Sequence, residues 1–271
     1  MFSLSHLSTP TVMGILNVTP DSFSDGGHHM RVDKAVSSAL DMITHGAGII
    51  DIGGESTRPG AQAVDVEQEL ERVIPVIEQL RSETDIPISI DTHKPEVMRA
   101  AVAAGASMIN DVNALRTPGA LQAAGELQVP VCLMHMQGEP RTMQHKPDYS
   151  NVIEEVIEFL LRRVEACEAQ GLSKNEIALD PGFGFGKTID HNYALFAAIP
   201  RFLELKYPIL IGVSRKSMLG AVTNKPIEQR VAASVAAATM AAEWGAQIIR
   251  VHDVDATMDA MRVVNAVKNN K

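Results

Sequence analysis

Polar residues with catalytic or binding potential follow short apolar segments at regular intervals along this chain. They are Asn17, residues 55–58, Asp91, Asn110, His135, Asp180, residues 214–216, Arg250 and His252. A single Asp or Asn after a strand is most often a helix cap. Eight segments that each end in a functional group favour a common site instead, provided that the fold brings those ends together.

The chemistry of these residues divides into two groups. Asp91, Asn110, Asp180 and Lys216 offer hydrogen-bond acceptors and donors that suit a flat, nitrogen-rich heterocycle. A carboxylate can accept two parallel N–H bonds from an amidine-like edge, and a lysine can donate to a ring oxygen or nitrogen. Arg58, Arg250 and His252 could form a separate clamp for an anion.

The glycine-rich stretch DPGFGFGKT, residues 180–188, resembles a phosphate-binding loop but has the wrong spacing. A Walker A loop requires a glycine five positions before the final one, and Pro181 stands there. The dinucleotide-binding spacing also fails, since Ile189 occupies the position of its third glycine. We therefore predict that Asp180 is the functional residue of this stretch and that Lys187 lies at a helix start or on the surface.

Eight near-continuously apolar segments predict buried parallel strands. They cover residues 12–16, 48–53, 87–91, 107–111, 129–135, 176–180, 208–213 and 247–252. Helical patterns lie between them, for example at 151–170 and 231–244. The alternation favours one (β/α)8 TIM barrel domain over residues 1–271, with a doubly wound open sheet as the alternative. In such a barrel the functional groups would meet at the C-terminal ends of the strands.

Local signals add detail to this prediction. Asp65 is expected to cap a helix that carries an apolar stripe, and Pro75 is expected to kink or end that helix early. The βα loops at 20–27 and 54–61 are rich in Gly, Pro, Ser and Asp and are candidate lids over the site.

Composition narrows the possible functions. The 271 residues carry a net charge of −9, which argues against binding to nucleic acid or to an anionic membrane. Two cysteines without a C-x-x-C spacing, and the lack of a signal peptide or spanning segment, predict a cytoplasmic protein. A metal hydrolase is less favoured because the nine histidines form neither H-x-H nor H-E-x-x-H. Ser214 lacks the G-x-S-x-G context of a nucleophile, and Cys132 is expected to be buried.

The motifs together resemble the dihydropteroate synthase family across nearly the whole chain. They are MGILNVTPDSFSDGG (13–27), DIGGESTRPGA (51–61), SIDT (89–92), INDV (109–112), LMHMQGEPRTMQ (133–144), LDPGFGFGKT (179–188), IGVSRKSMLG (211–220) and IRVHDV (249–254). The resemblance implies a TIM barrel, Mg²⁺ as cofactor and a homodimer formed through outer helices. It also implies condensation of 7,8-dihydropterin-6-ylmethyl diphosphate with p-aminobenzoate to give 7,8-dihydropteroate, a reaction that sulfonamides inhibit as mimics of p-aminobenzoate.

Roles for individual residues follow from the same resemblance. The pterin site would comprise Asp91, Asn110, Met134, Asp180, Phe185, Gly212 and Lys216. Diphosphate would meet Asn17, Thr57, Arg58, Arg250 and His252, with Asn17 also binding Mg²⁺. The p-aminobenzoate pocket would use Phe23, Asp25, Arg58, Phe185, Lys216 and Ser217. Catalysis would rest on Asp91, Arg58, Lys216, Arg250 and His252, while Gly182, Gly184 and Gly186 turn the chain under the pterin between walls made by Phe183 and Phe185.

Two rivals stay open at this point. A pterin-dependent methyltransferase would share the barrel and the Asp and Asn groups but would not need Arg58. A pterin-binding protein without catalysis is the alternative from another class.

Overall fold

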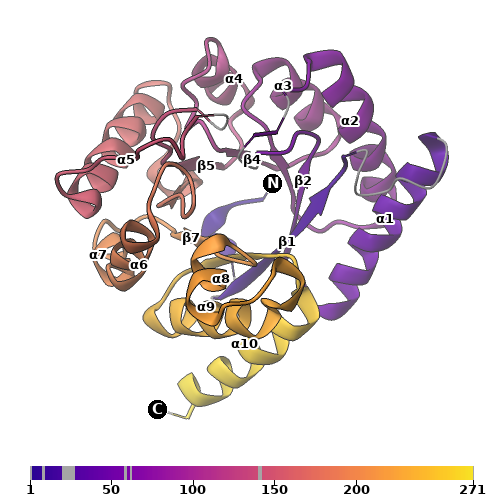
Figure 1. Cartoon of the computed structure of the whole chain (residues 1–271). Helices are drawn as coiled ribbons and strands as arrows, with labels where there is room; N and C mark the ends of the chain where they lie inside the picture. The colour runs from indigo at the N-terminus through magenta and orange to yellow at the C-terminus, as the bar shows by residue number, and fades with distance from the viewer. Residues whose placement is uncertain are drawn as a thin grey trace.

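The fold is built on an eight-stranded parallel sheet that curls into a barrel (Figure 1). The computed structural model describes residues 2–7, 10–19, 28–57, 60–61, 63–139 and 142–270. The strands are β1 Thr11–Asn17, β2 Ile49–Gly53, β3 Ile88–Asp91, β4 Met108–Asp111, β5 Val131–Met134, β6 Ile177–Asp180, β7 Leu210–Ile211 and β8 Ile248–Val251. All eight predicted strands are confirmed, with ends that are trimmed or extended by one to a few residues.

Closure of the sheet distinguishes the barrel from the open-sheet alternative. The strand order is β6-β5-β4-β3-β2-β1-β8-β7, and the two outermost strands meet through a parallel bridge between Leu179 and Ile209. The Leu179 N–H also donates to the Pro208 carbonyl at 2.8 Å. The (β/α)8 prediction is therefore confirmed, and the doubly wound sheet is excluded.

Helices form a ring outside the strands (Figure 1). They are α1 His28–His45, α2 Val66–Glu83, α3 Pro95–Ala104, α4 Ala120–Leu127, α5 Val152–Ala169, α6 Ile189–Ala197, α7 Ile199–Leu203, α8 Ser217–Thr223, α9 Val231–Trp244 and α10 Val254–Lys268. Within the described ranges, no helix is long and apolar enough to cross a membrane.

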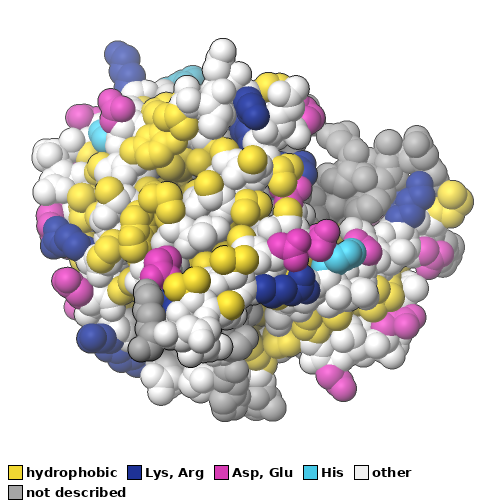
Figure 2. Space-filling model, turned by 90° about the horizontal axis from the view of Figure 1, so that it is seen from below, with side chains coloured by type: hydrophobic (Ala, Val, Ile, Leu, Met, Phe, Trp, Pro, Cys, Tyr) yellow, Lys and Arg dark blue, Asp and Glu magenta, His cyan; other side chains and the backbone are white. Residues whose placement is uncertain are grey.

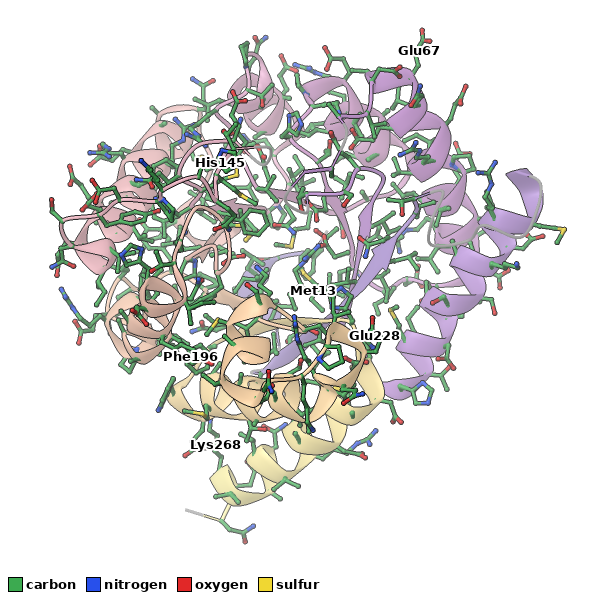
Figure 3. All side chains as sticks on the ribbon, in the orientation of Figure 1. Met13, Glu67, His145, Phe196, Glu228 and Lys268 are labelled. Carbon is green, nitrogen blue, oxygen red and sulfur yellow. The ribbon has the colours of Figure 1, made fainter. Side chains whose placement is uncertain are left out.

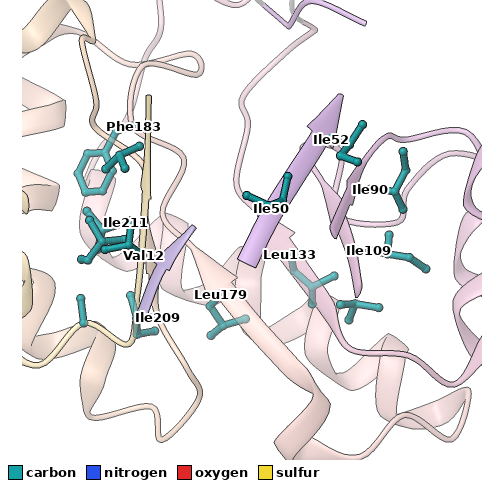
Figure 4. Packing of buried hydrophobic residues seen from close by; sticks show 14 of the residues in the cluster. Val12, Ile50, Ile52, Ile90, Ile109, Leu133, Leu179, Phe183, Ile209 and Ile211 are labelled. Carbon is teal, nitrogen blue, oxygen red and sulfur yellow. The ribbon is translucent and has the colours of Figure 1, made fainter. Parts of the chain in front are cut away.

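Strand periodicity separates an outer core from an inner one, because successive side chains of a strand point to opposite faces. On β2, Ile50 and Ile52 belong to the outer core, which fills the space between strands and helices (Figure 4). Ile49 belongs to a smaller inner core with Met13, which lies near the centre of the ring in Figure 3. The inner core is completed by Leu4, Met108, Cys132, Ala178, Leu210 and Ile248.

The N-terminal segment closes the inner core from below. The short 3-10 helix η1, Leu4–His6, supplies Leu4, and Phe2 and Leu7 pack against the same cluster. Two residues after Ile49, Met108 and Ile248, the next inward positions of the same strands are polar. They are Asp51, Asn110 and Arg250. The barrel therefore has an apolar floor, and its polar inward residues lie toward the C-terminal ends of the strands.

The helix with Pro75 differs from expectation. Asp65 caps α2 as predicted, accepting from the Gln68 N–H at 2.8 Å, but α2 continues through Pro75 to Glu83. Internal proline costs about 3 kcal/mol or more through one lost backbone bond and a steric clash. The apolar stripe on both sides of Pro75 is fully buried, and its packing on the barrel outweighs that cost: Val73, Val76, Ile77 and Leu80. The early end is therefore wrong, and the kink given as its alternative stays a prediction.

Candidate active site

A pocket opens at the C-terminal end of the barrel and collects most of the predicted site residues. It encloses about 320 Å³ of open space, solvent at its mouth included. Its lining is Thr57, Asp91, Asn110, Val112, Met134, Asp180, Phe185, Gly212, Lys216 and Arg250. All seven residues of the predicted pterin set are present, and of the lining only Val112 was not predicted.

Strand geometry explains this convergence. Asp91, Asn110, Met134 and Asp180 occupy the last or the second-to-last positions of four successive strands, β3 to β6, and have the inward parity of the inner core. Asp111, one residue beyond Asn110, points outward and instead accepts the Asn113 and Leu115 backbone N–H groups, each at 2.7 Å. Its role is to hold the turn after β4.

A buried charge cluster forms the pocket wall between β8, β2 and β3. Arg250 donates from Nε to Asp51 Oδ2 at 2.6 Å and from one Nη to Asp91 Oδ2 at 2.7 Å. Asn110 Nδ2 donates to the same Asp51 oxygen at 3.1 Å, so the amide oxygen of Asn110 is left as an acceptor. Asp51 was not predicted, although a carboxylate inside the apolar segment GIIDIG was a usable signal.

Burial shifts the ionisation of the pocket groups toward neutrality. It raises the pKa of Asp91 to about 7, against the opposing effect of Arg250. Burial also raises the pKa of Asp180, opposed by Lys216 and by the Gly182 N–H that Asp180 accepts at 2.7 Å. The pKa of Lys216 falls to about 8 because of burial, although Asp180 favours its charged form. Asp91 and Lys216 can therefore change charge near neutral pH.

The glycine-rich loop 182–186 lies against the pocket. Gly182, Gly184 and Gly186 have φ values of 71°, 80° and 64°, in the left-handed region that favours glycine. Phe185 lines the pocket, and the Lys216 ammonium lies 4.6 Å from its ring centroid. Phe183 was expected to form a second wall but is fully buried in the outer core, where its ring meets Phe196 edge to face.

Lys187 lies at a helix start, as one of its two predicted alternatives has it, because it directly precedes Thr188, the cap of α6. The other alternative, a surface position, is wrong: the residue is only 3% exposed. Its ammonium donates to the Gly182 carbonyl at 2.8 Å, to His135 Nδ1 at 2.9 Å and to the Phe185 carbonyl at 3.0 Å. The side chain therefore turns back beneath the loop that it ends.

Three other predicted residues lie at the same end of the barrel outside the pocket lining. Asn17 ends β1 beside Gly53, and Ser217 begins α8. His252 follows β8, and its Nδ1 and backbone N–H both approach the Ser214 hydroxyl, at 3.1 and 3.2 Å. Phe23, Asp25 and Arg58 lie outside the described residues.

Charged groups also anchor the start of the 54–61 loop. Glu55 contacts the Lys94 ammonium and, at 3.4 Å, His93 Nε2, while Lys94 also pairs with the fully buried Glu69. Burial would raise the pKa of Glu55, but the hydrogen bonds from His93 and Lys94 hold it at about 2. This ionised carboxylate fixes the backbone just before Thr57. Sequence reasoning missed the network because its members come from three separate segments.

The fold and the pocket define an α/β-barrel enzyme with a site for a flat ring rich in N–H donors. Carboxylate, amide and ammonium groups converge on one cavity from strands β3, β4 and β6 and from the segment after β7. The pocket lies at the strand ends that carry active sites in this fold.

Comparison with known proteins identifies the class more closely. Residues 13–252 match the model of the pterin binding enzyme family. A dihydropteroate synthase of Escherichia coli K12 is 54% identical over 265 residues, which cover 98% of this chain and 94% of that protein. The chain belongs to the pterin-binding enzymes and, among them, to the dihydropteroate synthases.

Solved structures agree over the full length. A Yersinia pestis dihydropteroate synthase in a sulfonamide complex superposes with a TM-score of 0.92 at 51% identity, covering 99% of this chain and 96% of that one. A Xanthomonas albilineans dihydropteroate synthase in complex with 7,8-dihydropteroate superposes with a TM-score of 0.88 at 52% identity, covering 98% of this chain and 95% of that one.

Gly182 provides a test of how tightly the loop is packed. A Cβ there would lie 1.8 Å from the His135 carbonyl oxygen, whereas a Cβ at Gly60, which also has a positive φ of 80°, would meet no atom of the described residues within 4 Å. We expect Gly182→Ala to lower the free energy of unfolding by more than about 3 kcal/mol, and Gly60→Ala by about 1–2 kcal/mol from backbone strain alone. Urea denaturation measures both. Equal losses would contradict the close packing.

Proposed function

We propose that this chain joins p-aminobenzoate to the methylene carbon of 7,8-dihydropterin-6-ylmethyl diphosphate, releasing pyrophosphate and forming 7,8-dihydropteroate. The observation that carries the proposal is the convergence of Asp91, Asn110, Asp180 and Lys216 on one pocket. Membership of the family and the product complex of the Xanthomonas albilineans relative support it further.

Pterin recognition follows from the donors and acceptors that the pocket residues can still offer to a ligand. Asp180 would accept two parallel N–H bonds from the aminopyrimidine edge of the ring. The Asn110 amide oxygen, free because its nitrogen is engaged by Asp51, would accept a further ring N–H. Lys216 would donate to a ring oxygen or nitrogen, and Met134, Phe185 and Gly212 would shape the flat slot around the ring.

The diphosphate would lie at the outer part of the site. Thr57 and Arg250 line the pocket, and Asn17, Arg58 and His252 belong to adjacent strand ends or loops. Arg250 would keep its bonds to Asp51 and Asp91 and offer its remaining N–H groups to the phosphate oxygens.

A magnesium ion fits this donor set. Mg²⁺ typically retains several waters and binds through one or two protein oxygens plus substrate phosphates. The Asn17 amide can provide such an oxygen, since its side chain makes no hydrogen bond to any residue that the structure describes. Among those residues there is also no cluster of three His, Cys, Asp or Glu that would form a complete protein cage. When bound, the ion would neutralise charge on the departing diphosphate.

The p-aminobenzoate would bind between the pocket and the loops. Its carboxylate would meet the start of α8, where Lys216 and Ser217 are adjacent, and its ring would pack against Phe185. Phe23, Asp25 and Arg58 would complete this pocket from the two loops.

The proposed substitution is dissociative. The leaving diphosphate is stabilised by Arg58, Arg250 and His252, and the electron-rich dihydropterin can carry the positive charge left on the methylene group. Asp91 faces that cation and stabilises it. The arylamine is neutral at pH 7 and attacks without a strong general base, while the closed loops would exclude water.

We also propose a cytoplasmic homodimer. Both cysteines are free and buried, which fits a reducing compartment. Helix α9 is apolar on nearly all sides and exposes Ala232, Ala236 and Met240 at a spacing of four residues. Hydrophobic side chains gather over much of the face seen in Figure 2, and exposed ones on α8 and α10 include Val222, Val263 and Val267.

Activity is the first test. Purified protein with Mg²⁺ and both substrates should form dihydropteroate, detected by mass spectrometry, and a sulfonamide should compete with p-aminobenzoate. Arg58→Ala should lower kcat/KM by about 100-fold or more, because charge stabilisation on the leaving group is lost. Binding of the pterin alone should be nearly unchanged. Unchanged dihydropteroate formation by this variant would contradict the role given to Arg58, and no dihydropteroate formation by the wild type would favour one of the two rivals, the methyltransferase or the binding protein.

The pH profile tests the pocket charges. Ionised Asp91 should be needed, so kcat/KM for the pterin diphosphate should fall as pH drops below about 7. Protonated Lys216 should also be needed, so kcat/KM should fall again above about pH 8. Lys216→Arg should remove the alkaline limb, because arginine stays charged above pH 12. An alkaline limb that survives this substitution would contradict the assignment.

The oligomeric state tests the apolar face. Light scattering during gel filtration should give twice the 29.2 kDa of one chain. Val263→Asp should shift the mass toward the monomer, because a charge would be buried in the interface, whereas Glu165→Asp on the distant α5 should not. A monomeric wild type would overturn the dimer.

A further inference from the structure

The loop 182–186 has a feature that its glycines do not explain: side chains hold all five of its carbonyl groups. Lys187 donates to the carbonyls of Gly182 and Phe185, and Lys216 donates to that of Phe183. Gln144 Nε2 donates to the Gly184 carbonyl at 2.5 Å, and the Tyr149 hydroxyl to that of Gly186 at 2.7 Å. Such a complete set indicates that the loop's position matters.

Lys187 is the most buried of these donors, and its ammonium is held by neutral groups. Its partners are His135 Nδ1 and the carbonyls of Gly182, Phe185 and His135, the last at 3.3 Å. It forms no ion pair with a carboxylate in the described part of the chain. Burial lowers the pKa of Lys187, and Asp180 opposes that effect. A cation without a carboxylate partner is costly in a protein interior, so the hydrogen bonds to the loop and to His135 must offset that cost.

The contacts of Lys187 join two walls of the pocket. Gly182 and Gly186 lie in direct backbone contact with the segment after β5, since an added Cβ would lie 1.8 Å from the His135 oxygen and 2.4 Å from the Gln137 oxygen. Met134 ends β5 immediately before that segment, and Phe185 stands on the loop. The ammonium bonds both sides of this contact and therefore fixes the separation of Met134 and Phe185.

A second effect passes through Lys216. This lysine donates to the Phe183 carbonyl and lies over the Phe185 ring, so the loop also determines where its ammonium stands. A shift of the loop would move Phe185 and Lys216 together relative to Asp180. Lys187 itself is absent from the pocket lining.

We propose that Lys187 is a positioning residue of the pterin site: through the loop carbonyls and His135 it sets the width of the slot and the place of Lys216. The inference rests on the pterin role proposed above for this pocket. It concerns binding of the pterin ring first, and it extends to the arylamine because Phe185 and Lys216 also belong to the p-aminobenzoate pocket proposed above.

The test compares Lys187→Met with Lys225→Met. Methionine keeps an unbranched stem but removes the donors, and Lys225 is an exposed lysine whose side chain makes no hydrogen bond to the described residues. The Kd of 6-hydroxymethylpterin is measured calorimetrically, well below the Tm of each variant, together with KM for both substrates. Lys187→Met should raise the Kd by about 10- to 100-fold, the loss expected when a buried hydrogen bond to the ring is no longer made. KM for p-aminobenzoate should rise as well, because Phe185 and Lys216 also contact that substrate, and Lys225→Met should match the wild type.

The outcomes separate positioning from stability. A purely structural Lys187 would lower Tm and leave the pterin Kd unchanged, which would overturn the proposal. If Lys187→Met does not fold, Lys187→Arg keeps the charge but spreads its donors over a planar fork that cannot reproduce the cage. A raised pterin Kd in this variant supports the proposal, and an unchanged one overturns it. A wild type that does not bind the pterin would instead refute the function proposed for the pocket.

Discussion

Closure of the parallel sheet is the constraint on which the rest of this structure depends. Once Leu179 and Ile209 join the last strands, every second residue of each strand must face the barrel interior. The lower inward positions are apolar and fill that space, as Met13 and Ile49 do. The inward positions at the C-terminal ends of the strands face the same space. One pocket is therefore lined by Asp91, Asn110, Asp180 and Arg250.

The convergence of these side chains buries several charged groups close together, and neighbouring groups of opposite charge offset that cost. Asp51, Asp91 and Asp180 share the interior with Arg250 and Lys216, far from the screening of bulk water. Arg250 bridges Asp51 and Asp91, so its guanidinium both neutralises them and holds their orientation. The acidic chain thus keeps its cations where an anionic ligand would need them. The net charge of −9 belongs to the whole chain and does not reveal how charges are arranged in the site.

Sequence reasoning recovered the elements and the pocket for a clear reason. Parallel strands in a barrel are buried on both faces and read as continuous apolar runs, and residues at their C-terminal ends are bound to converge. It failed where the partner is distant in the chain. Asp51, Glu69 and Lys94 acquire their roles only through contacts across neighbouring strands or helices.

The position of the Lys187 side chain also could not be predicted from the local sequence. A lysine beside a helix start is usually solvated, and nothing in GKTID reveals that its side chain folds back toward His135. The turn is possible because three glycines with positive φ bring the loop carbonyls beneath the chain. The early end of α2 at Pro75 was wrongly predicted because the local cost of proline is visible in the sequence, whereas the packing that offsets it is not.

Internal hydrogen bonds hold the polar side chains of the pocket, and this bears on how the pocket selects a ligand. Asn110 is held by Asp51, Asp180 by the Gly182 N–H, and Lys216 by the Phe183 carbonyl. A ligand therefore orders few side chains on binding, and the entropic cost of association is reduced. Selectivity then depends on the hydrogen-bonding capacity that these internal bonds leave unused. The Asp180 carboxylate and the Asn110 amide oxygen can still accept, and the Lys216 ammonium can still donate. A ring that lacks matching N–H groups would leave those acceptors buried and unpaired, which is a stronger discrimination than any loss of apolar contact.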